Sequence, residues 1–223
     1  MKDIPVIVIS SSEKGVGKTT IALNLSAALW ADGYKVAILS TDSIYENFIK
    51  QRELLNKKNR LKLPFPQIIS DIKTAKDIDV IVADIPSEKN EEYAEIFSSA
   101  HTLITVISNQ EKDSWLSGSS YINLIWDAKK NIAAKGIKYL NWIVVPNLLN
   151  MDDTSSLKNI ETNAKKYGYR IASPIKKRAS YQYINNGFCS ADMTSSPYFK
   201  MTMSDVYARR EILTLTDFLW QHK

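Results

Sequence analysis

The chain has 223 residues, of which 44% are hydrophobic and 24% are charged, and we expect a single domain over residues 1–223. No apolar run approaches the roughly 20 residues needed to cross a bilayer, so we expect no membrane partner. The net charge of +5 permits attraction to a polyanion but does not establish it. The single cysteine, Cys189, cannot form an internal disulfide, and two histidines offer few zinc ligands, so we expect a cytoplasmic protein without zinc.

Short apolar, β-branched runs alternate with longer helical patterns along the chain. We predict strands at Ile4–Ile9, Lys35–Leu39, Pro66–Ile69, Val80–Ala83, Leu103–Ile107, Ile143–Val145 and near Arg170–Ala172. Two of these runs, Val80–Ala83 and Ile143–Val145, are apolar at successive residues, as is typical of strands covered on both faces. The alternation predicts an α/β fold, with a doubly wound, mostly parallel sheet and helices on both faces.

Three segments show the helical spacing of residues on one face. These faces consist of Ile21, Leu25, Ala28 and Leu29; of Trp115, Ser119, Ile122 and Trp126; and of Ala208, Ile212, Leu215 and Leu219. We interpret Trp115, Trp126 and Trp142 as core or interface residues.

The stretch from Ser10 to Thr20, SSSEKGVGKTT, has the pattern of a phosphate-binding loop. A predicted strand precedes it and a predicted helix follows, so backbone N–H groups and the positive end of the helix dipole converge on one anion. Glycines let the backbone approach that anion, the lysine can reach the terminal phosphates, and the threonine hydroxyl can hold magnesium. The predicted nucleotide-binding residues here are Lys14, Gly15, Val16, Gly17, Lys18, Thr19 and Thr20.

Two acidic residues follow predicted strands, where doubly wound sheets bind their ligands. Asp84 follows an apolar strand and can hold magnesium through a water molecule. Asp42 follows the strand that ends at Leu39 and can orient an attacking water or hold the metal's shell. Either aspartate could instead cap the next helix, since Asp is a favoured N-cap residue.

With these motifs, the chain resembles the ParA/MinD family of deviant Walker-motif P-loop ATPases, and within it the small plasmid-partition ParA proteins. The segment Trp142–Asn147 resembles the late strand whose asparagine contacts adenine in this family. The segment Pro174–Gly187 resembles the one that follows the last strand in plasmid-type ParA proteins. The resemblance covers most of the chain, with the elements in matching order.

The resemblance implies ATP and Mg²⁺ as ligands, with Lys18, Asp42 and Asp84 as the catalytic residues. Lys18 would bind the β- and γ-phosphates, Thr19 and Asp84 would hold the metal, Asp42 would serve the attacking water, and Asn147 would contact adenine. It also implies a homodimer that forms on ATP binding, DNA binding without sequence preference, and a ParB-like or adaptor protein that stimulates weak hydrolysis. Such a nucleoid-associated ATPase would partition or position a plasmid, a chromosome or another cargo.

The chain departs from the family pattern in the loop and after the second strand. Ser12 stands where the usual pattern has its first glycine, and because serine is small we expect the loop to close. The family's extra lysine, in K-G-G-x-G-K-T, corresponds to Glu13, and Lys14 replaces the next glycine, so whether Lys14 replaces that lysine stays open. The family's D-x-D-P-Q reads STDSI at residues 40–44 and keeps only Asp42.

Basic residues that could bind DNA phosphates are Lys176, Lys177, Arg178, Arg209 and Arg210, and a weaker cluster is Lys57, Lys58, Arg60 and Lys62. The alternative is that these runs are solvated helix faces. The C-terminal helical segment carries Glu211 and Asp217 on a face that is not rich in lysine, so we expect it to pack on the sheet rather than on a membrane.

Two other functions remain open. One is an ATP-dependent ligase resembling dethiobiotin synthetase, whose T-D-x-G-V-G-K-T loop is similar to residues 12–19 and has an acidic residue at the position of Glu13. The other is a nucleotide-binding interaction module that has lost hydrolysis.

Overall fold

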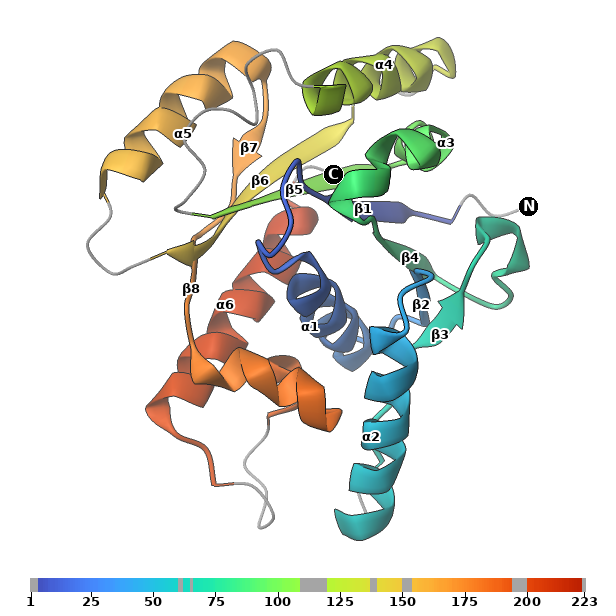
Figure 1. Cartoon of the computed structure of the whole chain (residues 1–223), viewed down its shortest axis with the longest axis vertical. Helices are drawn as coiled ribbons and strands as arrows, with labels where there is room; N and C mark the ends of the chain where they lie inside the picture. Colours follow the sequence, from blue (N-terminus) through green and yellow to red (C-terminus); the bar gives the residue numbers. More distant parts are fainter. Residues whose placement is uncertain are drawn as a thin grey trace. The chain divides into compact units, whose positions relative to one another are not determined.

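The computed structural model describes residues 4–59, 62–64, 66–108, 120–136, 140–149, 154–193 and 200–221. The strands are β1 (Val6–Ser10), β2 (Val36–Leu39), β3 (Gln67–Ile69), β4 (Val80–Asp84), β5 (Thr102–Ser108), β6 (Asn141–Leu149), β7 (Arg170–Ile171) and β8 (Ile175–Lys176) (Figure 1). The α-helices are α1 (Lys18–Ala31), α2 (Ile44–Asn59), α3 (Ala94–Phe97), α4 (Ser120–Ala134), α5 (Thr154–Tyr167) and α6 (Met203–Leu219). Short 3₁₀ helices are η1 (Ile72–Thr74), η2 (Ser87–Tyr93), η4 (Ala179–Asn186) and η5 (Ser190–Asp192).

The strands form an eight-stranded sheet in the order β3-β2-β4-β1-β5-β6-β7, with β8 paired to β6. The pairings β1–β5, β2–β3, β5–β6, β6–β7 and β6–β8 are parallel. These findings confirm the predicted α/β fold with a mostly parallel sheet. Each predicted strand is present, but β6 runs past Pro146 to Leu149 and the two-residue strand β8 was not predicted.

By their contacts, the residues divide into two compact units. Unit 1 comprises residues 1–18 and 82–177, and unit 2 comprises residues 19–81 and 178–223. The single domain over residues 1–223 stays a prediction. No helix among the residues described is both long enough and apolar enough to cross a bilayer.

In unit 1, the helix α4 packs a face that differs from the predicted one. Its buried residues are Tyr121, Ile122, Ile125, Ala128 and Ile132. Ile122 lies on this face as predicted, but the prediction that Trp126 shares it is wrong, because that side chain is 39% exposed. The ammonium of Lys129 lies 4.6 Å from the Trp126 ring centroid and 4.7 Å from that of the buried Trp142, so it contacts both the exposed indole and a core indole. Trp115 and Ser119 lie outside the described residues, whereas Trp142 is buried as predicted.

In unit 2, the helices α1 and α6 pack differently. The four residues predicted to share a face of α1 are buried, but so is every other residue from Ile21 to Leu29, so burial is not confined to that face. The predicted face of α6 is confirmed, since its four residues are all buried. Before α6, Thr202 and Asp205 form a capping box: the Thr202 hydroxyl accepts from the Asp205 N–H, and the Asp205 carboxylate accepts from the Thr202 N–H.

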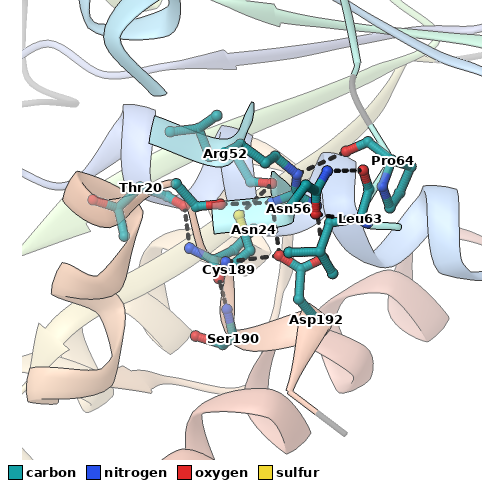
Figure 2. Close-up of polar contacts among 11 residues, drawn as sticks. Thr20, Asn24, Arg52, Asn56, Leu63, Pro64, Cys189, Ser190 and Asp192 are labelled. Carbon is teal, nitrogen blue, oxygen red and sulfur yellow. Dashed lines mark hydrogen bonds and ion pairs between the residues drawn. The ribbon is translucent and has the colours of Figure 1, made fainter. Parts of the chain in front are cut away.

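A buried ion pair joins α2 to η5 in unit 2 (Figure 2). The Arg52 guanidinium donates to both carboxylate oxygens of Asp192, at 2.7 and 2.8 Å. It also donates to the carbonyl oxygens of Pro64 (2.7 Å) and Gly187 (3.1 Å). Arg52 is only 1% exposed, and these four bonds satisfy a charge that would otherwise be costly to bury.

Candidate functional site

The loop after β1, residues 11–17, depends on two glycines with different surroundings. Gly15 has a φ of 76° and Gly17 a φ of 91°, in the left-handed region that glycine occupies without strain. A Cβ atom on Gly17 would collide with the side-chain nitrogen of Asn147, whereas a Cβ on Gly15 would have no atom within 4 Å. Gly17 therefore lets the loop pass a neighbouring side chain, and Gly15 leaves open space beside the loop.

Asn147 holds the loop from the end of β6. Its side chain is 4% exposed, and its Nδ2 donates to the carbonyl oxygen of Val16 at 2.7 Å. This contact ties residues that are 131 positions apart in the chain. The predicted contact of Asn147 with adenine stays a prediction, and the role visible here is to fix the loop.

The lysine at the end of the loop contacts the backbone of the loop itself. Lys18 begins α1, and its Nζ donates to the carbonyl oxygen of Glu13 at 3.1 Å. The backbone N–H of Glu13 donates to the hydroxyl of Ser11 at 3.1 Å. Ser12, at the position of the usual first glycine, has a buried hydroxyl with no hydrogen-bond partner among the described residues.

Asp84 lies at the same end of unit 1. It is the last residue of β4 and is 5% exposed. The N–H of the next residue, Ile85, donates to the carbonyl oxygen of Ile9 at 2.9 Å, so the carboxyl ends of β4 and β1 are neighbours. Unit 1 therefore brings the loop, Lys18, Asp84 and Asn147 to the carboxyl ends of its strands.

The short helix η2, which follows Asp84, contacts the loop at two points. Asn90 is buried and donates from Nδ2 to the carbonyl oxygen of Ser11 at 2.9 Å. Glu88 forms an ion pair with Lys14, with 3.1 Å between Oε1 and Nζ. Sequence reasoning missed Glu88 and Asn90, because neither belongs to a motif.

A buried chain of hydroxyls supports the last residue of β1. The Tyr121 hydroxyl lies 2.7 Å from the Ser10 hydroxyl and 2.8 Å from that of Thr105, and the Trp142 indole N–H donates to Thr105 at 2.9 Å. These residues were also missed. The signal that could have found them is a Ser or Thr inside an otherwise apolar strand, which needs a partner when it is buried.

In unit 2, the predicted residues Thr19 and Thr20 lie in the first turn of α1. Asn24 donates from Nδ2 to the Thr20 carbonyl oxygen at 2.8 Å, and its Oδ1 accepts from the Ser190 N–H at 2.7 Å (Figure 2). Asp42 accepts from the N–H of Ile44, the first residue of α2, at 3.0 Å. Asp42 thus accepts from the first N–H of α2 but lies two residues before the helix rather than at its N-cap, and its role toward an attacking water stays a prediction.

The predicted DNA-binding residues differ in how their charges are used. Lys177 and Arg210 are exposed, and Lys176 and Arg209 are half-buried. Arg178 instead donates to Glu211, at 2.6 Å for the shortest contact, and this hydrogen bond raises the pKa of Arg178 although burial opposes the rise. In the weaker cluster, Lys57, Lys58 and Lys62 are exposed and Arg60 lies outside the described residues.

The features around the loop fit a bound nucleoside triphosphate and a hard cation. Two lysines supply positive charge, Gly15 leaves room for an anion, and the buried Ser12 hydroxyl offers a hydrogen bond. Asp84 provides a buried carboxylate, the ligand type that Mg²⁺ prefers.

Comparisons with known proteins agree with this geometry. The chain is similar to the family ATPase MipZ, whose model matches residues 5–76 and 70–220. No curated protein matches the sequence.

Solved structures show the same fold at low sequence identity. A chain of the MinC:MinD cell division protein complex of Aquifex aeolicus is 18% identical, with a TM-score of 0.60 over 98% of this chain and 96% of that one. A protein of Borrelia burgdorferi B31 described as a plasmid partition protein, bound to AMPPNP, is 17% identical, with a TM-score of 0.56 over 98% and 99%. Cobyrinic acid a,c-diamide synthase of Mycobacterium smegmatis, with ADP and magnesium, is 15% identical, with a TM-score of 0.55 over 82% and 91%. The two ranges matched by the family model together span nearly the whole sequence, and the chain therefore belongs to the ATPase MipZ family, within the ParA/MinD group of P-loop ATPases.

Proposed function

We propose that this chain is a ParA-like ATPase that dimerises when it binds ATP, binds DNA without sequence preference, and thereby partitions or positions a cargo. A ParB-like or adaptor protein would stimulate its hydrolysis and release. The proposal is supported by membership in the ATPase MipZ family and by the similarity to a plasmid partition protein bound to AMPPNP.

The observation that carries the proposal is the loop itself. Two glycines with positive φ, a lysine that begins a helix and a buried aspartate at the end of the neighbouring strand form a site suited to a triphosphate with its cation. An eight-stranded α/β sheet alone would not distinguish this function from others.

Each residue of the site has a proposed role. Lys18 binds the β- and γ-phosphates, Thr19 and Asp84 hold Mg²⁺, and Asp42 orients the attacking water. Asn147 contacts adenine while its amide holds the loop. The cation, when bound, neutralises charge on the phosphate oxygens.

The experiment that tests this function is steady-state ATP turnover with and without duplex DNA. A ParA-like ATPase turns over slowly and is sensitive to DNA. A ligase ignores DNA and requires a small substrate, and a passive module binds ATP without turning it over. Lys18→Ala should abolish binding of a non-hydrolysable ATP analogue, and an unchanged affinity would contradict the assigned site.

The role of Asp42 needs a substitution that separates catalysis from the hydrogen bond to Ile44. Asp42→Asn keeps a side-chain oxygen that can accept from the Ile44 N–H but removes the negative charge, because an amide oxygen is also a hydrogen-bond acceptor. We expect this variant to fold with near wild-type stability and to remain as an ATP-bound dimer, seen by size-exclusion chromatography. Normal turnover in Asp42→Asn would remove the residue from the mechanism.

A further inference from the structure

The ion pair between Lys14 and Glu88 places a negative charge beside the open part of the loop. Lys14 precedes Gly15, and a Cβ atom on Gly15 would meet no atom within 4 Å. The Lys14 ammonium lies 3.1 Å from the Glu88 carboxylate. A carboxylate close to a site for a highly charged anion opposes binding of that anion.

Glu88 is fixed by its own segment, η2. Its carboxylate accepts a hydrogen bond from the Ser87 hydroxyl at 3.3 Å. Its own backbone N–H, and after it the hydrogen bond from Lys14, lower the pKa of Glu88, so the side chain is charged at neutral pH. Two residues later, Asn90 anchors η2 to the Ser11 carbonyl at a buried point.

Lys14 is the member of the pair that can change partners. Its side chain is 73% exposed and carries its charge on a flexible four-carbon stem. Exposed ion pairs contribute little to stability, so breaking this one costs little. A nucleoside triphosphate carries more negative charge than one carboxylate and therefore competes well for the ammonium.

We propose that Glu88 is a competing counter-ion for Lys14, which holds the lysine until a nucleoside triphosphate takes it over. This inference rests on the proposed function, because it requires a nucleotide in the loop. A diphosphate lacks the terminal phosphate and competes less well. The exchange therefore makes the loop discriminate between the two nucleotides. When a triphosphate is bound, the Lys14–Glu88 contact is lost and only the Asn90 contact of the two still holds η2 to the loop.

Calorimetry on four variants tests the exchange, with a magnesium-bound, non-hydrolysable ATP analogue and ADP as the ligands. The variants are Glu88→Gln, Lys14→Ala, the double variant, and Glu91→Gln as the matched control, since Glu91 is exposed and lies in the same helix. We expect Glu88→Gln to raise the affinity for the analogue about two- to fivefold, the range of exposed ion pairs, and to change that for ADP less. Glu91→Gln should leave the ratio of the two affinities near its wild-type value.

The double variant distinguishes exchange from simple repulsion. If Lys14 changes partners, Glu88→Gln gains less affinity in the Lys14→Ala background than in the wild type; if the gain is the same, the inference is wrong. Equal effects of Glu88→Gln and Glu91→Gln would also overturn it. A wild-type chain that binds neither nucleotide would overturn the proposed function as well, and the two failures are thereby distinguished.

Hydrogen exchange gives a readout that does not depend on affinity. In the wild type, amides of residues 87–89 should exchange faster with the ATP analogue than with ADP. In Glu88→Gln, which lacks the charged contact, this difference should be smaller. Identical exchange of the wild type with both nucleotides would contradict the proposal.

Discussion

Asn147 and Gly17 constrain the loop through a single close contact. The Asn147 amide donates to the Val16 carbonyl oxygen, and this brings it against the Cα of Gly17. Any side chain at Gly17 would have to displace a buried amide that already has a hydrogen bond. The glycine is therefore required by two independent conditions, its φ of 91° and the space that the asparagine occupies.

We predict that Gly17→Ala lowers the free energy of unfolding by about 2 kcal/mol or more, because it adds left-handed strain and disturbs the Asn147 hydrogen bond. Binding of the ATP analogue should be lost with it. The matched control is Gly33→Ala, where φ is 94° but a Cβ would meet no atom within 4 Å. That variant should lose only about 1 kcal/mol in urea unfolding. Equal losses of unfolding free energy in the two variants would show that the Asn147 side chain moves aside at no cost.

Among the elements, α2 is tied to η4 and η5 by the guanidinium of Arg52 (Figure 2). Gly187 ends η4 with a φ of 74°, and a Cβ there would collide with the backbone of Arg52. The chain therefore approaches α2 closely at Gly187, and five residues later Asp192 pairs with the charge of Arg52. This arrangement couples the conformations of two segments that are distant in the sequence.

We predict that Arg52→Met destabilises the fold by about 3–5 kcal/mol, since it leaves the carboxylate of Asp192 buried without its partner. Asp192→Asn should cost less when it is added to Arg52→Met than when it is made alone, and urea unfolding of the single and double variants measures this coupling. The control is Lys130→Met, which breaks an exposed pair with Asp127 and should cost less than about 1 kcal/mol. Additive losses at Arg52 and Asp192 would contradict the coupling.

The capping box of α6 predicts a dependence of stability on pH. Burial would raise the pKa of Asp205, but hydrogen bonds from Ser180 and Thr202 outweigh it and lower the pKa. A lowered pKa in the folded state means that the stabilisation is present above the pKa of the unfolded chain, about 4, and is lost as pH falls through the folded value.

We predict that Asp205→Asn loses about 1 kcal/mol of stability at pH 7, a typical value for a cap. The loss should shrink when urea unfolding is repeated at pH 3, because Asp205 of the unfolded wild type then binds a proton that the folded state, with its lowered pKa, binds less readily. A loss of the same size at both pH values would mean that the charge of Asp205 does not stabilise the helix.

The elements that sequence reasoning predicted well are those with local signals. The strands are short apolar runs, and α6 carries its buried residues at regular helical spacing, so both can be read from neighbouring residues. The face of α4 was misjudged because Trp126 is apolar by composition but stays partly exposed, with the Lys129 ammonium against its ring. The all-round burial of α1 fits its own residues, since small and apolar side chains stand on nearly every side of the helix, a signal that the prediction of one face overlooked.

For the molecule as a whole, the same distinction applies to the site. The phosphate-binding loop is contiguous, so its glycines and lysine form a recognisable motif. The contacts that hold it and the end of β1, from Asn147, Asn90 and Tyr121, come from residues 131, 79 and 111 positions away from their partners. No local pattern predicts such pairings, because they arise only when parallel strands bring their carboxyl ends together.

The basic residues proposed to bind DNA differ from one another in exposure and in ion pairing. Lys177 and Arg210 are exposed, whereas the charge of Arg178 is balanced by Glu211. Each phosphate contact that is removed lowers the slope of log affinity against log salt by about 0.9 for duplex DNA. We predict that Lys177→Gln and Arg210→Gln each reduce the slope by about this amount, measured by fluorescence anisotropy with the ATP analogue present.

Arg178→Gln should change the slope less and stability more, because it leaves the partly buried Glu211 without its strongest contact. If Arg178→Gln alone flattens the salt dependence, its guanidinium must leave Glu211 for phosphate in the complex, and Glu211→Gln should then strengthen DNA binding.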